Sequence, residues 1–111
     1  MTRRIDCPLP AYPLAWVELP DEWLGAHLLK RDAGIKAAAK FGNDKLVIFA
    51  ISLCIAEGWA GLPGIEGRDP ARWDFERVPL AIITWLEEAV FDDFSRAFVV
   101  PKVSSPPPPA G

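Results

Sequence analysis

The 111-residue chain has few of the residues that usually carry chemistry. It contains a single histidine, His27, and two cysteines far apart, Cys7 and Cys54. This set cannot supply a His-based metal cluster or a tetrahedral zinc site. The glycine-rich stretch GLPGIEG at 61–67 lacks the Lys-Ser/Thr ending of a phosphate-binding loop. The sequence therefore predicts a non-enzymatic protein with no catalytic, cofactor-binding or metal-binding residues.

The chain also lacks a long hydrophobic run. The longest, Leu46 to Ala56, is interrupted only by Ser52, and its 11 residues fall short of the ~20 that span a membrane. The N-terminal MTRRIDCPLP begins with charge but develops no apolar signal-peptide core. A net charge of −3 and a pI near 5.1 argue against nucleic-acid binding, which needs a positive footprint. We expect a soluble, cytoplasmic protein without bound nucleic acid or membrane.

The three potentially reactive side chains each have a structural interpretation. Cys54 lies in the most apolar segment, where a small buried hydrophobe is expected and a reactive thiolate is not. A Cys54–His27 nucleophile pair is disfavoured for the same reason, and His27 is interpreted as structural. Cys7 lies in a proline-rich arm and is expected to be an exposed free thiol. Without a secretory signal, we expect no disulfide between the two cysteines.

Half of the residues are hydrophobic, including five tryptophans, so a core can form. The patterning predicts a mainly α fold, a bundle of about three helices over 21–41, 44–57 and 79–98. These helices belong to a single domain, 15–98, with a long irregular loop at 58–78. Prolines 8, 10 and 13 predict an extended arm over 1–14, and four consecutive prolines predict an extended C-terminal tail over 99–111. The stretch AWVEL at 15–19 fits either a short edge strand or an extended lead-in.

The first two helices have recognisable boundaries. Acidic residues at 21 and 22 suit the first turn of a helix, and Gly42 suits a stop. Gly34 weakens the middle of the first helix, which predicts a bend or break near 32–34. Asn43 or Asp44 can cap the second helix, although the β-branched content of 44–57 also fits a buried strand. The first helix shows a loose apolar stripe: Trp23, Leu24, His27, Leu28, Ile35, Ala38, Ala39 and Phe41.

The third helix carries both a core stripe and an acidic side. Pro79 suits its first turn. Its predicted core residues are Ile83, Leu86, Val90 and Phe94, and its acids are Glu87, Glu88, Asp92 and Asp93. Glu88 and Asp92 share a face, but no flanking ligands suggest a cation cage. We therefore predict a partner-binding surface formed by the outward side of this helix and the N-terminal region: Trp16, Trp85, Glu88, Phe91 and Asp92.

Charge is distributed unevenly along the chain. Basic residues gather on the first helix and at Lys45, whereas acidic residues gather on the third helix. Two explanations remain open, and the first is favoured. The helices could lie side by side with complementary charges, or each face could meet a different neighbour in an assembly, where charges select orientation and partner.

Several segments resemble the small tail assembly chaperones of long-tailed bacteriophages. They are WVELPDEWLGAHLLKRD at 16–32, the apolar segment 44–57, LPGIEGRDPARWDFERVPLAIITWLEEAV at 62–90, and a Pro/Ser tail beginning PKVSS. The resemblance covers about Trp16 to Ser105. Its most specific part is WDF at 73–75, followed by VPL at 78–80 and Trp85.

The resemblance implies a helical chaperone that coats the tape measure protein, helps recruit tail tube subunits, and leaves before the virion matures. Such a protein would act in the host cytoplasm and could form homo-oligomers. The alternative is a structural virion component, such as a head–tail adaptor or minor tail protein, which would be present in purified particles. A small enzyme or a regulator is disfavoured, because the sequence has no usable His, Cys or glycine-loop constellation and only one basic helix.

Overall fold

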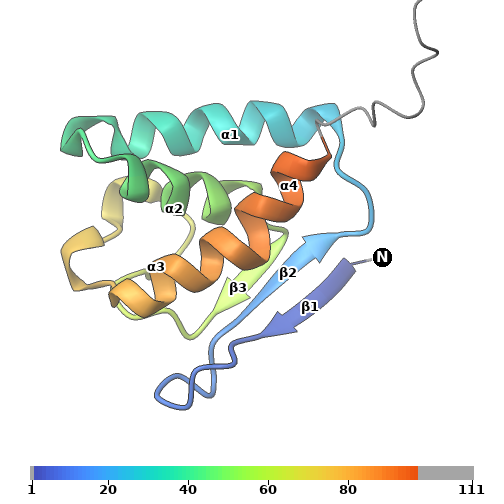
Figure 1. Ribbon diagram of the computed structural model, residues 1–111. Coiled ribbons are helices and arrows are strands. Elements are labelled where there is room, and N and C mark those ends of the chain that lie inside the picture. Colours follow the sequence, from blue (N-terminus) through green and yellow to red (C-terminus); the bar gives the residue numbers. More distant parts are fainter. Residues whose placement is uncertain (1, 98–111) are drawn as a thin grey trace, which may run out of the picture.

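The computed structural model describes residues 2–97, in which three helices and a three-stranded antiparallel sheet share one hydrophobic core (Figure 1). The fold is thus α/β, and the prediction of a mainly α bundle is wrong on this point. The missing element was the sheet, whose strands are only three to five residues long. Segments this short show too few alternations to stand out in a sequence.

The sheet has the order β1 (Thr2–Asp6), β2 (Trp16–Pro20), β3 (Gly58–Ala60). The stretch predicted as an edge strand or lead-in is therefore the central strand, and the N-terminal arm supplies the strand beside it. The three prolines of the arm lie in the turn between β1 and β2, so none of them interrupts the β1–β2 hydrogen bonds. Val17 and Leu19 are almost fully buried, whereas Trp16 and Glu18 are half-buried, which is the alternation of a one-sided sheet.

Helix α1 (Gly25–Ala38) starts four residues later than predicted and ends in a short 3₁₀ turn, η1 (Ala39–Phe41). Its start is capped by His27, whose Nδ1 accepts a hydrogen bond from the Leu24 backbone N–H at 2.9 Å. The predicted bend near Gly34 is absent, because α1 runs unbroken through it. A Cβ at Gly34 would lie 2.6 Å from the Ile51 Cα, so this glycine allows α1 and α2 to approach closely.

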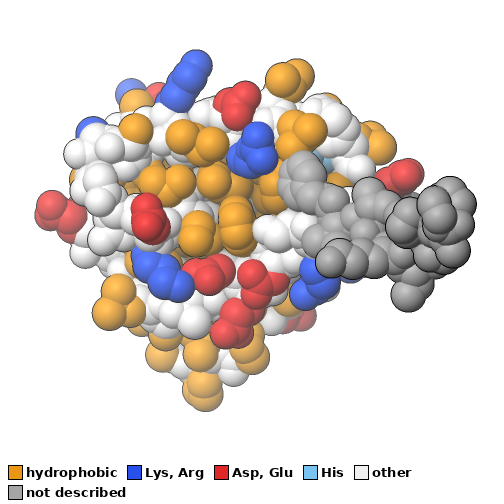
Figure 2. Space-filling view, turned by 45° about the horizontal axis from the view of Figure 1, so that its top comes forward, with side chains coloured by type: hydrophobic (Ala, Val, Ile, Leu, Met, Phe, Trp, Pro, Cys, Tyr) orange, Lys and Arg blue, Asp and Glu red, His pale blue; other side chains and the backbone are white. Residues whose placement is uncertain are grey.

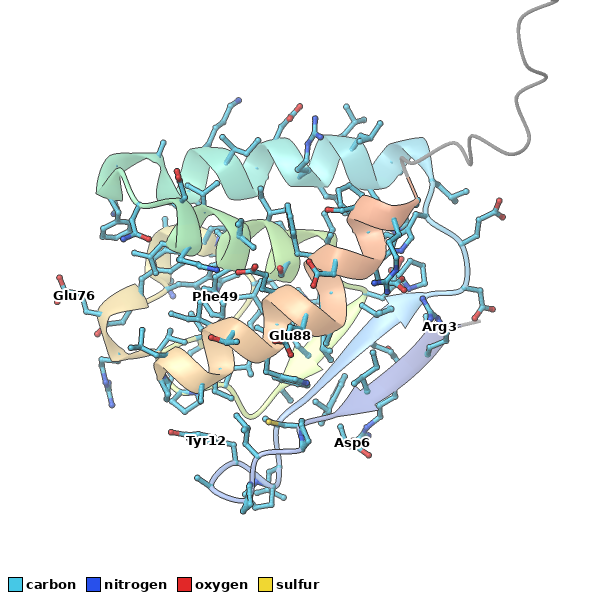
Figure 3. The ribbon with its side chains drawn as sticks, in the orientation of Figure 1. Arg3, Asp6, Tyr12, Phe49, Glu76 and Glu88 are labelled. Atoms are coloured by element: carbon cyan, nitrogen blue, oxygen red, sulfur yellow. The ribbon has the colours of Figure 1, made fainter. Side chains whose placement is uncertain are left out.

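Helix α2 (Asp44–Ile55) occupies the centre of the molecule, between α1 and the third helix (Figure 1). The prediction of a helix here is confirmed, and so is its N-terminal boundary at Asp44. Gly42 adopts a left-handed φ of 59°, and Asn43 Oδ1 accepts a hydrogen bond from the Leu46 N–H at 3.1 Å. Phe49 lies in the interior of the fold and is fully buried (Figure 3).

The third helix consists of α3 (Leu80–Leu86), a π-helical turn η4 (Glu87–Phe91) and α4 (Asp92–Arg96), with helical backbone throughout. The predicted core stripe is confirmed: Ile83, Leu86, Val90 and Phe94 are at most 6% exposed. The predicted end of this helix at residue 98 and the proline-rich tail over 99–111 lie outside the described residues.

The segment predicted as an irregular loop contains β3 and two 3₁₀ turns, η2 (Pro70–Arg72) and η3 (Phe75–Arg77). Leu62 and Ile65 are buried, as expected for residues that pin the loop to the core. The Asp74 N–H donates to the Gly64 carbonyl at 2.9 Å, and Trp73 Nε1 donates to the Gly67 carbonyl at 2.9 Å. These bonds close the loop on itself and give it a fixed shape.

Candidate protein-binding surface

The predicted partner-binding residues do not form one surface. Trp85 is only 7% exposed and belongs to the hydrophobic core, so the expectation that it faces outward is wrong. The third helix packs in a core that also includes residues of the sheet, and it buries a wider arc than one apolar stripe. Trp85 falls within that arc together with its neighbours Ile82 and Leu86.

Trp16 lies on the sheet, apart from the other predicted residues. It stands on the opposite pleat from the buried Val17, and the Arg4 guanidinium lies 4.6 Å from the centre of its ring. This cation–π contact and the half-buried state of Trp16 indicate a side chain that packs on the outer face of the sheet.

The remaining predicted residues stay together on the third helix. Glu88 is exposed on the front of this helix in Figure 3, and Phe91 and Asp92 are half-buried. Phe91 packs against the edge of the core. The third helix therefore carries four of the five predicted residues, and three of them, Glu88, Phe91 and Asp92, are at least partly exposed.

An apolar hollow lies between the start of α1 and the end of α4. It has a volume of about 160 Å³ and is lined by Trp23, Leu24, Gly25, Leu28, Phe94 and Ala97. Leu24 is 56% exposed at its rim, and Leu29 and Ile35 of α1 are 74% and 40% exposed. In Figure 2, hydrophobic side chains gather in the middle of the face shown, with acidic residues along one border. We call the lining of this hollow the α1–α4 surface.

Sequence patterning assigned Leu24 and Leu28 to a stripe expected to face the core. They are four residues apart and share a helix face, but only Leu28 packs against the core. Periodicity shows that two residues lie on one face, and it does not show whether another element covers that face. The signal for this part of the surface was present, but the sequence could not distinguish core from interface.

The acidic residues of the third helix are partly neutralised within the chain. Glu87 forms a 2.8 Å ion pair with Lys45, and Asp93 pairs with Arg3 at 3.0 Å and Arg96 at 3.3 Å. This agrees with the intramolecular explanation, but these partners lie outside the first helix. Glu88, by contrast, is exposed on the front of the third helix (Figure 3).

Asp93 links three parts of the fold. Its Oδ2 accepts hydrogen bonds from Trp23 Nε1 at 2.9 Å and from Arg3 Nη2 at 3.0 Å, so it joins α4 to strand β1 and to the segment before α1. Burial of the carboxyl opposes its ionisation, but the hydrogen bonds from Trp23, Arg3 and Arg96 outweigh burial and lower the pKa of Asp93.

We predict that Asp93→Asn lowers the free energy of unfolding near pH 7 by about 1–2 kcal/mol, because it removes charge-assisted hydrogen bonds. A carboxyl whose folded pKa lies below its unfolded pKa stabilises the fold above the unfolded value of ~3.9, and this stabilisation is lost as pH falls through the folded pKa. The difference between the wild type and the variant should thus shrink as pH falls below the unfolded value of ~3.9. Urea titrations at several pH values measure it, with Asp32→Asn on exposed α1 as control. A constant difference across the pH range would contradict the prediction.

The histidine and cysteines are placed as structural residues. His27 is 4% exposed, and its Nε2 lies 2.9 Å from Glu57 Oε1. Both cysteines are free thiols. Cys7 is 9% exposed, which corrects the expectation of an exposed thiol, because its N–H pairs with the Ala15 carbonyl and holds the base of the β1–β2 turn. Cys54 is half-buried, and burial raises the pKa of its thiol.

Within residues 2–97, no three His, Cys, Asp or Glu side chains are grouped so that they could hold a metal ion. No helix in this part of the chain has both the length and the apolar character needed to cross a bilayer. Comparisons of the chain with protein-family models, curated proteins and solved structures find no match. The function is therefore inferred from the residues and surfaces of the chain itself.

Proposed function

We propose that this protein is a non-enzymatic tail assembly chaperone of a long-tailed bacteriophage, which binds the tape measure protein and helps tail tube assembly. The observation that carries the proposal is the α1–α4 surface, an open apolar hollow next to the acidic side of the third helix. The segmental resemblance described above supplies the identity of the partner. The structure contributes a surface of a kind that fits a helical client.

An amphipathic client helix fits this surface physically. Such helices bind in grooves through apolar anchors spaced three or four residues apart. Full burial of a leucine-sized side chain contributes about 1.5–3 kcal/mol, so the leucines of α1 together with Phe91 could support a reversible complex. The acidic residues of the third helix, including Glu88 and Asp92, favour a client helix with basic residues beside its apolar stripe.

We predict that Leu24→Glu reduces capture of a co-expressed tape measure protein at least about tenfold, because it places a charge at the rim of the hollow. Leu80→Glu is the matched control, since Leu80 is 80% exposed on α3 and does not line the hollow. Capture is measured by pull-down from cells that express both proteins. Equal loss in the two variants, or no loss in either, would contradict the assignment of this surface.

Mass spectrometry of purified virions separates the chaperone from the structural alternative. A chaperone is expected to be absent from mature particles, whereas a head–tail adaptor or minor tail protein should be present in stoichiometric amounts. Detection at subunit stoichiometry would overturn the chaperone proposal even if the α1–α4 surface binds a partner.

A further inference from the structure

A second hollow, separate from the α1–α4 surface, lies where α1, α2, β3 and the loop at 61–74 meet. Its volume is about 240 Å³, and it is lined by Lys30, Ala33, Leu53, Cys54, Ala56, Trp59, Arg68, Pro70 and Trp73. Lys30 and Ala33 lie roughly half a turn around α1 from Leu24 and Leu28, since each helical residue advances by about 100°. The two hollows therefore open on different flanks of α1.

Two tryptophans form aromatic walls of this second hollow. The rings of Trp59 and Trp73 meet edge to face with their centres 5.9 Å apart, and Trp73 makes a similar contact with Phe75 at 6.1 Å. The hydrogen bond from Trp73 Nε1 to the Gly67 carbonyl fixes the orientation of the indole. Flat apolar walls held in this way suit another aromatic ring, which can stack or pack edge-on against them.

The loop that carries Trp73 is preformed. Gly64 has a φ of 83°, and a Cβ there would lie 2.7 Å from the Asp74 carbonyl oxygen, so the two ends of the loop are in close contact. The Arg68 guanidinium also donates to the Glu57 carbonyl at 3.0 Å, which ties the loop to the end of α2. A ligand would therefore meet a hollow that already has its shape, which lowers the entropy cost of binding.

The charged groups of this hollow are of one sign. The side chains that line it include two cations, Lys30 and Arg68, and no carboxylate. The nearby Glu57 carboxylate lies outside the lining and contacts His27 at 2.9 Å. The hydrogen bond from His27 and the positive charges of Lys30 and Arg68 lower the pKa of Glu57, so this carboxylate offsets part of their charge. The Cys54 thiol adds no negative charge at neutral pH, since burial raises its pKa. An anion at the rim would thus meet two positive charges above an apolar floor.

We propose that this hollow is a binding site for a small aromatic carboxylate, with the ring packed against Trp59 and Trp73 and the carboxylate toward Lys30 and Arg68. Its volume lies at the small end of ligand pockets, which favours a ligand of one or two fused rings. The inference does not depend on the proposed chaperone function, because it concerns a different flank of α1 and a different class of ligand.

The test is a titration of the ¹⁵N-labelled protein with 2-naphthoate, followed by the indole N–H signals of its five tryptophans. We expect saturable shifts at Trp59 and Trp73, and no comparable shifts at Trp16, Trp23 and Trp85, which do not line this hollow. The neutral analogue 2-naphthamide has the same ring system and should bind about two- to fivefold more weakly, as expected for loss of a partly exposed charge interaction.

Three variants and one control sharpen the test. Lys30→Gln and Arg68→Gln should each weaken 2-naphthoate binding about two- to fivefold. Ala33→Leu should abolish it by filling the mouth of the hollow from an exposed helical position. Lys36→Gln, an exposed change elsewhere on α1, should leave binding unchanged. Unchanged spectra of the free variants would confirm that they fold.

Several outcomes would overturn the proposal. They are the absence of saturable shifts, shifts shared equally by all five indoles, and equal affinity for 2-naphthoate and 2-naphthamide. Full retention of binding by Lys30→Gln and Arg68→Gln would also overturn it. None of these results would bear on capture of the tape measure protein, so the two proposals can fail independently.

Discussion

Gly34→Ala is expected to lower the free energy of unfolding by about 2–3 kcal/mol, although alanine is the better helix former by roughly 1 kcal/mol. The added Cβ would lie 2.6 Å from the Ile51 Cα and 2.7 Å from the Ile51 nitrogen. Both are backbone atoms of α2, so no side-chain rotation can relieve the contact. The two helices must separate, which weakens packing across the α1–α2 interface.

Gly25→Ala is the matched control for this prediction. Gly25 is the first residue of the same helix, and a Cβ there would meet no atom within 4 Å. The control should therefore be neutral or slightly stabilising, by up to about 1 kcal/mol, as helix propensity suggests. Thermal and urea unfolding of both variants measure the difference. If Gly34→Ala were as stable as Gly25→Ala, the close approach of α1 and α2 would be wrong.

Gly34 also shows where sequence reasoning reaches its limit. A glycine within a helical pattern predicts weakness when only local propensity is considered. Its role here is tertiary, because the absence of a side chain lets another helix come close. No property of residues 32–34 by themselves could show that α2 packs against this point.

The sheet was missed for a related reason. The prolines of the N-terminal arm disfavour a helix and predict an extended arm, but they do not predict that the arm pairs as a strand. Because they lie in the β1–β2 turn, they leave the paired residues free to hydrogen-bond. Strand pairing between residues 2–6 and 16–20 depends on a partner strand that the local sequence does not reveal. Length and the cap at Asn43 or Asp44 predict α2, and regular spacing predicts the core stripe of the third helix; the structure confirms both.

The residues of the third helix also differ in whether local spacing alone could place them. The stripe Ile83, Leu86, Val90 and Phe94 could be predicted because its spacing matches one helix face. Trp85 could not, because its burial depends on a wider arc of the third helix being covered than that single stripe. The sequence predicts that the acids of the third helix pair with basic residues of the same chain. In the structure, the partner of Glu87 lies at the start of α2 and a partner of Asp93 lies on β1. The sequence shows the chemistry of each residue, but it does not show which distant segment that residue contacts.

Trp85→Ala is expected to lower the free energy of unfolding by about 3–5 kcal/mol, because Trp85 is 7% exposed and its loss leaves a large cavity. For a domain of this size such a loss is a large part of the total stability, so partial unfolding at physiological temperature is expected. Chemical denaturation and near-ultraviolet circular dichroism would measure it. A Trp85→Ala variant of wild-type stability would show that this side chain is not part of the core.

Phe91→Ala provides the contrast that matters for function. Phe91 is half-buried at the edge of the core, so its truncation should cost less, about 1–2 kcal/mol, and leave the fold intact. If Phe91 contributes to client binding, this variant should lose capture of the tape measure protein while keeping its native spectrum. Loss of capture in Trp85→Ala would reflect unfolding instead. A partner-binding role on the third helix is therefore tested at Phe91, Glu88 and Asp92, and not at the buried Trp85.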